Sequence, residues 1–304
     1  MNENAENDRL DSTSEFEQLR PVLLGLAYRL LGSMWDAEDI VQDAYLRWLR
    51  IDRTTVRDSR PYLMTTVSRL ALDLLSSARV RREAYPGPWL PEPVPTGALG
   101  PMDTVELRDT VSYATVHMLQ RLSPPERAVF VLREAFELPY EDIAGVVGAS
   151  VAACRQMHHR ARARLSEGRD RFRPSASDHA RLLVTFLAAA QNGDLSGLTK
   201  LLSDDVVAWV DGGGRVRAAL RPINGRERVV AFLTGLVSRY PIGSTRMVGV
   251  NGEPALLLSV DGQEQLVAVG LRNGLIDSIF AVMNPDKLAR LRTPEPGSDL
   301  AAGH

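Results

Sequence analysis

A short stretch of basic and amide side chains near the middle of the sequence is suited to non-covalent chemistry with nucleic acid. Arginine and glutamine donors match acceptors on base edges, and further arginines suit phosphates. A second, largely apolar set of residues alternates with these polar side chains at helical spacing. A single helix would therefore bury the apolar set and expose the polar one. The predicted buried set is Val151, Cys154, His158, Ala161 and Leu165. The predicted outer set is Ala152, Gln156, His159 and Arg160, with Arg155 at its flank. Further arginines extend the positive charge: Arg162, Arg164, Arg169, Arg171 and Arg173.

Two shorter helices are predicted before this basic helix and would position it. Ser123-Pro124-Pro125-Glu126 begins the first, because serine can cap, proline suits the first helical position and glutamate follows three residues after the cap. Pro139-Tyr140-Glu141-Asp142 opens the second, and Gly148-Ala149-Ser150 ends it and supplies a cap for the basic helix. A further helix over Met102–Leu122 leads into this segment. This order predicts a helix-turn-helix that reads the major groove, with a solvated basic helix as the alternative.

The composition of the 304-residue chain is that of a soluble globular protein with one to three domains. No apolar run is long enough to span a bilayer, and the polar residues Met1–Ser14 predict a disordered tail rather than a signal peptide. The single cysteine, Cys154, excludes an internal disulfide framework and favours a reducing cytoplasm. The net charge of −2 means that any nucleic-acid binding depends on local basic patches.

Three amphipathic helices are predicted at the start of the chain, and short loops between them favour a compact bundle. The first covers Phe16–Leu31, the second begins at Asp36-Ala37-Glu38-Asp39, and the third runs from Arg60-Pro61-Tyr62 to Arg82. A charged loop, Ile51–Ser59, precedes the third helix. Two sets of polar side chains stay outside the buried stripes: Asp39, Gln42, Asp43 and Arg47 on the second helix, and Arg79, Arg81 and Arg82 at the end of the third.

Proline and glycine dominate residues 83–101, which excludes a helix or an inner strand there. The segment is predicted to be a linker that is locally stiff. It contains one large aromatic side chain in the sequence Trp89-Leu90-Pro91-Glu92-Pro93. An aromatic residue in a linker usually docks on another part of the protein, so we expect Trp89 to make such a contact. An idle exposed tryptophan is the alternative.

The composition changes after Ser175, where helices followed by strands are predicted. Helical patterns cover Asp178–Gln191, a second short segment ending near Leu202, and Gly225–Arg239, while Val206–Val210 reads as a strand. Four apolar runs follow, at 245–250, 255–260, 265–271 and 275–282. They are separated by Asn251-Gly252, Asp261-Gly262 and Asn273-Gly274, which are strong hairpin signals. An antiparallel meander after helices predicts a separate α+β domain.

Several of these segments resemble bacterial sigma factors of the extracytoplasmic-function group, in particular the subgroup with a SnoaL-like (NTF2-like) C-terminal extension. The segment 36–43 is similar to the region 2 helix that grips the polymerase clamp, and 61–82 is similar to the helix that works at the −10 element. The segment 122–165 resembles region 4, which reads the −35 element. Three short motifs are similar to those of the subgroup: Trp89-Leu90-Pro91-Glu92-Pro93, Asp211-Gly212-Gly213-Gly214 followed by Arg215 in place of lysine, and Asn284-Pro285-Asp286-Lys287-Leu288.

The resemblance implies two all-α domains, a sigma region 2 bundle and a region 4 helix-turn-helix, followed by an α+β NTF2-like (SnoaL-like) cone domain. The expected boundaries are a disordered tail at 1–13, region 2 at 14–82, a proline-rich linker at 83–103, region 4 at 104–173, the SnoaL-like domain at 178–292 and a tail at 293–304. The implied partners are core RNA polymerase and promoter DNA in the cytoplasm, without a membrane, a cofactor or a metal.

The resemblance also suggests roles for individual residues. The −35 element would be read by Arg155, Gln156 and His159, with Arg160 and Arg164 on phosphates. The −10 element would be met by Val56, Arg57, Asp58 and Ser59, with Arg79, Arg81 and Arg82 on the backbone unless they are only a solvated helix end. The polymerase would contact Asp39, Gln42, Asp43 and Arg47, a face that is plain solvated surface without the resemblance. The three motifs would regulate activity in cis, with Trp89, Asp211 and the segment around Asp286 forming one contact that sets the distance between the two DNA readers.

The C-terminal domain leaves other functions open. Such domains often enclose a pocket, so an unknown small-molecule ligand is a further possible partner. Catalysis there would need a paired acid and base, and Asp211 and Glu253 are candidates, but His179 is the single histidine of that domain. We therefore predict no catalytic residues. The alternatives are a one-component helix-turn-helix regulator that binds DNA without polymerase, and a SnoaL-like cyclase fused to a DNA tether.

Overall fold

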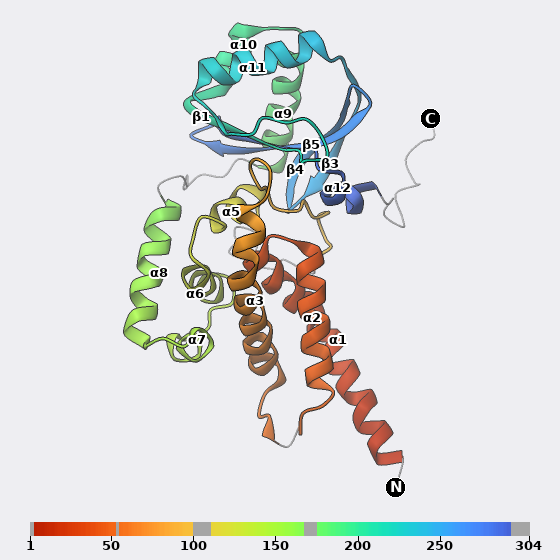
Figure 1. The fold of residues 1–304 in the computed structure, drawn as a ribbon, viewed down its shortest axis with the longest axis vertical. Coiled ribbons are helices and arrows are strands. Elements are labelled where there is room, and N and C mark those ends of the chain that lie inside the picture. Colours follow the sequence, from red (N-terminus) through yellow and green to blue (C-terminus); the bar gives the residue numbers. More distant parts are fainter. Residues whose placement is uncertain (1–2, 53–54, 100–110, 167–174, 293–304) are drawn as a thin grey trace. The chain divides into compact units, whose positions relative to one another are not determined.

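The computed structural model describes residues 3–52, 55–99, 111–166 and 175–292, with the backbone alone at 3–12 and 78–83. The chain forms two compact units (Figure 1). Unit 1 contains Met1–Ala84 and Gly97–Arg169, and unit 2 contains Tyr85–Thr96 and Asp170–His304. Most of the described part of the predicted linker therefore belongs to the same unit as the C-terminal domain.

Three helices form the first part of unit 1, as predicted. They are α1 (Glu3–Leu31), α2 (Met34–Trp48) and α3 (Ser59–Glu83). Ser33 caps α2, because its hydroxyl accepts a hydrogen bond from the backbone N–H of Asp36 at 3.2 Å. The three helices pack together around a shared apolar core. Its fully buried members include Leu26, Ala27, Leu30, Ala37, Ala44, Leu63, Val67 and Ala71.

The first helix, α1, begins within the segment 1–13 for which the sequence predicts a tail. The helix begins at Glu3, because the sequence has no glycine or proline before Pro21 to interrupt it. The hydroxyl of Thr13 lies 3.1 Å from the hydroxyl of Tyr45 on α2, which attaches this part of α1 to the bundle.

Four further helices form the second part of unit 1: α5 (Tyr113–Leu119), α6 (Pro124–Glu134), α7 (Tyr140–Val147) and α8 (Val151–Ser166). The predicted capping box of α6 is present, and the backbone N–H of Ser123 donates to Glu126 at 3.2 Å. Gly148 ends α7 with a φ of 70°, which favours glycine. Of the helix predicted over Met102–Leu122, residues 102–110 lie outside the described residues, and α5 begins after the cap Ser112.

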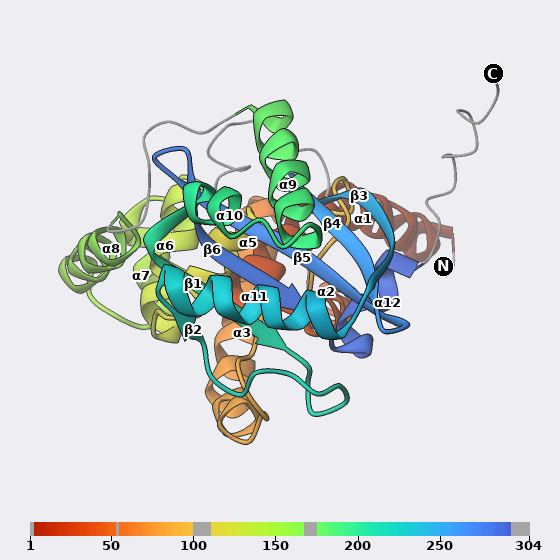
Figure 2. The same cartoon turned by 90° about the horizontal axis from the view of Figure 1, so that it is seen from above.

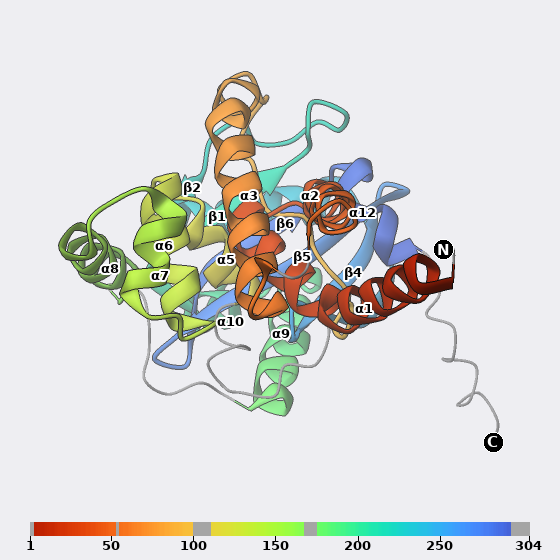
Figure 3. The same cartoon turned by 90° about the horizontal axis from the view of Figure 1, so that it is seen from below.

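The two parts of unit 1 pack against each other. Figure 3 shows α3 between α2 and α6, and both α1 and α3 contact α6. The buried Arg127 of α6 donates to the backbone oxygen of Leu30 at 2.5 Å, in the last turn of α1, where carbonyl groups lack helical partners. Arg69 of α3 donates to the backbone oxygen of Gly145 on α7 at 2.7 Å. Both predicted DNA readers therefore share one compact unit.

Unit 2 is an α+β domain, as predicted. Its described helices are α9 (Ala176–Gln191), α10 (Leu195–Leu201), α11 (Arg226–Arg239) and α12 (Pro285–Arg292). Its strands are β1 (Leu202–Asp211), β2 (Ile223–Asn224), β3 (Ile242–Val250), β4 (Glu253–Val260), β5 (Gln263–Arg272) and β6 (Leu275–Val282). They form a six-stranded sheet in the order β2-β1-β6-β5-β4-β3.

The predicted meander of β3 to β6 is confirmed. The first turn residues Asn251, Asp261 and Asn273 have φ values of 56°, 51° and 54°, and a glycine with positive φ follows each one. β1 pairs with β2 antiparallel and with β6 parallel. Parallel pairing needs a long crossover connection, so no local pattern in the sequence predicted it.

Helices α9 and α11 cover one face of the curved sheet (Figure 2). The space between them and the sheet is occupied by buried apolar side chains, among them Leu183, Phe186, Ala208, Leu256 and Ile279. Helices on one side of a curved, mostly antiparallel sheet match the predicted α+β fold class. Within the described ranges, no helix combines the length and the apolar character that crossing a bilayer would require.

Candidate functional site

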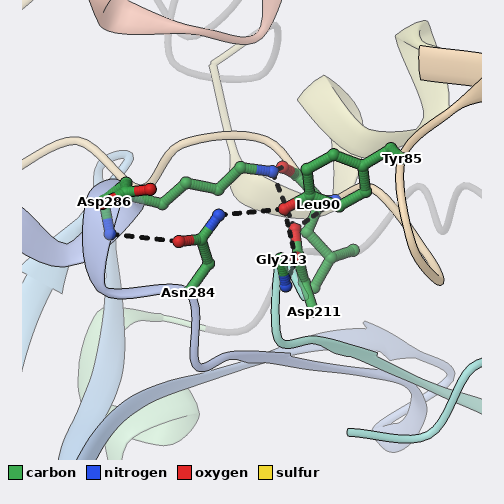
Figure 4. Close-up of polar contacts among 7 residues, drawn as sticks. Tyr85, Leu90, Asp211, Gly213, Asn284 and Asp286 are labelled. Carbon is green, nitrogen blue, oxygen red and sulfur yellow. Dashed lines mark hydrogen bonds and ion pairs between the residues drawn. The ribbon is translucent and has the colours of Figure 1, made fainter. Parts of the chain in front are cut away.

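The predicted linker and the C-terminal domain meet around one buried carboxylate, Asp211, at the end of β1 (Figure 4). The hydroxyl of Tyr85 donates to it at 2.6 Å, and the backbone N–H groups of Leu90 and Gly213 donate at 2.9 and 3.0 Å. The ammonium of Lys287 lies 2.7 Å from the same carboxylate. Four donors therefore compensate the burial of this charge. We name Tyr85, Trp89, Leu90, Asp211, Asn284 and Lys287 the linker cluster.

Lys287, at the start of α12, reaches the linker as well as Asp211. Its ammonium donates to the backbone oxygen of Leu90 at 2.5 Å. It lies 4.3 Å from the ring centroid of Trp89 and 4.9 Å from that of Tyr85, within the range of cation–π attraction. Trp89 is thus held by a cation that is itself paired with a buried carboxylate.

Tyr85 is a member of the linker cluster that the sequence did not reveal. Its hydroxyl accepts a hydrogen bond from the Nδ2 of Asn284 at 3.0 Å while it donates to Asp211. Burial, and then the hydrogen bond to Asp211, raises the pKa of Tyr85 well above its usual range. Its partners are far away in the sequence, so no local pattern could have indicated this role.

The three glycines after Asp211 allow the linker to approach closely. A Cβ on Gly212 would lie 2.2 Å from the backbone oxygen of Val216, and one on Gly213 would lie 2.3 Å from the Nδ2 of Asn284. A Cβ on Gly214 would lie 2.7 Å from Pro86. Gly213 and Gly214 also have φ values of 59° and 69°, which favour glycine. A side chain at any of these three positions would therefore clash with a neighbouring group.

The rest of the linker motif continues along the sheet of unit 2. The buried Glu92 accepts a hydrogen bond from the Nε of Arg290 at 3.0 Å. The backbone N–H of Val94 donates to the side chain of Asn251 at 3.1 Å, and the N–H of Asn251 donates back to Val94 at 2.8 Å. Leu90, Pro91, Pro93 and Val94 are buried. Residues 85–96 are therefore held at several points by unit 2.

The residues of the third motif, 284–288, differ in burial and in their contacts with the linker. Asn284 is buried, Pro285 is half-buried and Asp286 is exposed. The backbone N–H of Asp286 donates to the side chain of Asn284 at 3.1 Å, and its carboxylate lies 3.5 Å from the guanidinium of Arg215, which is also exposed. The contacts that tie this segment to the linker come from Asn284 and Lys287.

The predicted outer face of α8 is exposed, and the buried face includes Cys154, His158, Ala161 and Leu165. Arg160 and Arg164 lie 3.5 and 3.0 Å from the carboxylate of Glu126 on α6. Burial alone would raise the pKa of Glu126, but hydrogen bonds from Ser123 and the charges of Arg164 and Arg160 lower it below its usual range. The exposed side chains on this face are Arg155, Gln156, His159, Arg160 and Arg164.

The predicted outer face of α2 carries apolar residues that the sequence reasoning did not single out. Trp35 and Leu46 are exposed, with 56% and 42% of their surface accessible. They lie three turns apart on the stripe that also contains Asp39 and Gln42, because these positions are separated by three or four residues. The full set of predicted residues on this helix is exposed: Asp39, Gln42, Asp43 and Arg47.

The predicted −10 residues lie at the start and end of α3. Arg57 and Asp58 are exposed, while Val56 and Ser59 are half-buried. Asp58 accepts a hydrogen bond from the backbone N–H of Arg60 at 3.0 Å, which fixes the loop to the helix start. The helix continues through the other predicted residues, whose side chains lie outside the described residues: Arg79, Arg81 and Arg82.

Comparison with known proteins assigns these helices to a family. Residues 16–81 match the family Sigma-70 region 2, and residues 114–165 match the family Sigma-70, region 4. The ECF RNA polymerase sigma factor SigJ of Mycobacterium tuberculosis is 40% identical over 288 residues, which cover 90% of this chain and 92% of SigJ. The chain belongs to the ECF sigma factors. SigI of the same organism is 34% identical over 278 residues, which cover 90% of this chain and 93% of SigI.

The crystal structure of SigJ resembles this ECF sigma factor over nearly its whole length. The TM-score is 0.73 at 37% identity, and the match covers 91% of this chain and 98% of the SigJ chain. The region 2 family match covers part of α1, all of α2 and most of α3, and the region 4 match covers α8 and the helices before it. The similarity to SigJ also includes unit 2, so the α+β domain is part of what the two proteins share.

Proposed function

We propose that this ECF sigma factor binds core RNA polymerase, reads the −35 and −10 promoter elements with unit 1, and is regulated in cis by its linker cluster. The observation that carries the proposal is the pairing of region 2 and region 4 helices with an exposed basic face on α8.

Reading of the −35 element is assigned to α8. Its buried face packs on α6 and α7, so Arg155, Gln156 and His159 are exposed, and their donors can meet base edges in the major groove. Arg160 and Arg164 share one carboxylate and are more than half exposed, so they exchange Glu126 for DNA phosphates at low cost.

Polymerase binding is assigned to the exposed stripe of α2. On this stripe the exposed Trp35 and Leu46 flank the polar residues Asp39 and Gln42, and such a mixture of large apolar and polar side chains is the composition of a protein interface. An exposed tryptophan is also the side chain most often found to dominate binding energy. Asp43 and Arg47 complete the proposed polymerase face.

Recognition of the −10 element is assigned to the loop before α3. Arg57 and Asp58 project polar groups into solvent beside Val56 and Ser59, and such a loop can hold a base of melted DNA. The basic end of α3 is proposed to hold the DNA backbone through Arg79, Arg81 and Arg82.

The two readers must separate to occupy both elements. Elements about 25 base pairs apart are separated by roughly 85 Å, at about 3.4 Å per base pair. A folded unit of this size has a radius of gyration on the order of 15 Å. We therefore propose that polymerase binding breaks the contacts that Arg127 and Arg69 make between the two parts of unit 1.

The linker cluster is proposed to limit this separation. Residues 85–96, fully extended, would span at most roughly 40 Å, and unit 2 holds them in one fixed path. While these contacts persist, residues 85–96 cannot extend, so the tether between the two readers is shorter by the span of this segment. The cluster thus couples the C-terminal domain to promoter geometry.

Run-off transcription with purified core polymerase tests the proposal. We expect transcription to differ from that of the full chain when Trp89 is replaced by alanine or when the chain is truncated after Arg173. If neither change alters transcription, regulation in cis is excluded. A gel shift with and without core polymerase tests the sigma function itself, because a one-component regulator would bind its promoter specifically without polymerase.

A further inference from the structure

His158 belongs to the buried face of α8, but it is held by polar groups from two neighbouring helices. Its Nδ1 lies 2.8 Å from the hydroxyl of Tyr140 on α7, and its Nε2 lies 2.8 Å from the Oε1 of Glu134 on α6. Its ring centroid is 6.1 Å from that of Phe130. Because both ring nitrogens have partners, the imidazole is fixed in one orientation.

This arrangement continues from Tyr140 to the exposed face of α8. The guanidinium of Arg155 lies 5.4 Å from the ring centroid of Tyr140, and that of Arg133 lies 5.0 Å from it. Arg133 is itself fixed, because it donates to the backbone oxygen of Leu138 at 2.9 Å. A guanidinium stacked on an aromatic ring keeps its edge N–H groups available for a bidentate contact.

Arg155 is therefore oriented mainly by residues of α7. Besides the ring of Tyr140, the carboxylate of Glu141 lies 3.8 Å from its guanidinium. An arginine on a mobile side chain reads bases poorly, because a bidentate contact needs both N–H groups in one plane with the base. The hydrogen bond between His158 and Tyr140 fixes the ring on which Arg155 lies.

We propose that His158 is a positioning residue for base reading: through Tyr140 it places Arg155 for contact with the −35 element. The proposal rests on the function proposed for α8. A residue that only filled the core would be apolar, as its neighbours on the buried face are. The imidazole adds two hydrogen bonds, one to α6 and one to α7, and so ties the orientation of α7 to that of α8.

The test compares base discrimination with overall affinity. Holoenzyme is assembled from core polymerase and the full chain, and its affinity is measured for a promoter obtained by run-off transcription of genomic DNA and for all single substitutions in the −35 element. Arg155→Ala identifies the position that Arg155 reads. We expect His158→Leu and Tyr140→Phe each to lower the discrimination at that position by about tenfold, without changing affinity for unrelated DNA. His158→Gln should recover part of the loss, because an amide can replace both hydrogen bonds.

Controls distinguish a positioning role of His158 from an effect on folding and from a failure of the base reading proposed for α8. Cys154→Val alters the same buried face without touching the hydrogen bonds, so discrimination should stay unchanged. Tyr140→Phe keeps the ring and the core volume, and covers the case in which His158→Leu does not fold. The positioning role is overturned if Arg155→Ala lowers discrimination but folded His158→Leu and Tyr140→Phe do not. If Arg155→Ala itself has no effect at any position, base reading by Arg155 fails, and the role of His158 fails with it.

Discussion

Asp211 in unit 2 and Glu126 in unit 1 are both carboxylates that gather cations, but their partners differ in exposure. Asp211 is fully buried and the side chain of its partner Lys287 is 12% exposed. Glu126 is also largely buried, but Arg160 and Arg164 are 55% and 57% exposed. A buried pair loses much free energy when one partner is removed, whereas exposed arginines can change partners. The first arrangement fixes a contact, and the second leaves exposed charge for the contact with DNA phosphates that we propose.

Removing the charge of Asp211 should have the largest effect. Asp211→Asn leaves the ammonium of Lys287 largely buried without its carboxylate, which should destabilise the contact between residues 85–96 and unit 2 by about 3 kcal/mol. Amide hydrogen exchange of residues 85–96, followed by mass spectrometry, should become on the order of 100-fold faster. Asp286→Asn is the matched control, because this carboxylate is exposed and its loss should leave exchange unchanged. Unchanged protection in Asp211→Asn would mean that the buried pair does not hold the linker.

Removing the ring that covers Lys287 should have the next largest effect. Trp89→Ala removes a ring 4.3 Å from the ammonium and should destabilise the same contact by about 1–2 kcal/mol. Trp35→Ala, which removes the exposed tryptophan of α2, should leave exchange of residues 85–96 unchanged but weaken binding to core polymerase. The reverse pattern would show that the roles of the two tryptophans are assigned wrongly.

Glu126 should contribute less, and its contribution should depend on pH. Because the folded state lowers the pKa of Glu126, the stability it provides is present above its ordinary pKa of 4.5 and is lost as the pH falls through the lowered value. Glu126→Gln should cost about 1 kcal/mol at pH 7 and reduce the loss of stability in acid. Thermal unfolding followed by circular dichroism between pH 7 and pH 3 measures both. The variant should also bind unrelated DNA a few-fold more tightly, since Arg160 and Arg164 are freed; weaker binding would contradict the proposed exchange of partners.

Tyr85 should give the smallest effect near neutral pH, about 1 kcal/mol for Tyr85→Phe, because one hydrogen bond is lost while three other donors still compensate the charge of Asp211. The folded state raises its pKa, so its contribution is present below the ordinary pKa of 10.0 and is lost as the pH rises beyond that value toward the raised one. Absorbance of tyrosinate near 295 nm should therefore be the same for the folded wild type and Tyr85→Phe at pH 10 to 11. A wild type with one additional titrating tyrosine there would show that Tyr85 is not buried against Asp211.

The sequence predicted those features that local patterns determine. The turns at Asn251, Asp261 and Asn273, the capping box at Ser123 and the buried stripe of α8 all follow from neighbouring residues. Local patterns did not predict contacts between segments far apart in the sequence. The parallel pairing of β1 with β6 depends on segments far apart in the sequence, which local periodicity does not encode.

The candidate sites divide in the same way. Trp89 and Asp211 were singled out by their motifs, but Tyr85, Asn251 and Arg290 have no local signal, because each one acts through a partner more than 100 residues away. The exposure of Trp35 and Leu46 could not be predicted from the sequence, because large apolar residues of an amphipathic helix usually face the core.

The dependence of transcription on promoter spacer length tests the central claim most directly. A tether held by unit 2 should favour one spacing between the −35 and −10 elements, so wild-type holoenzyme should show a narrow optimum in run-off assays on a series of spacers. Asp211→Asn and Trp89→Ala should broaden this optimum, the double variant should add little to Asp211→Asn, and Asp286→Asn should match the wild type. A profile that stays unchanged in Asp211→Asn, while hydrogen exchange shows residues 85–96 released, would contradict the claim that the linker cluster sets the distance between the two DNA readers.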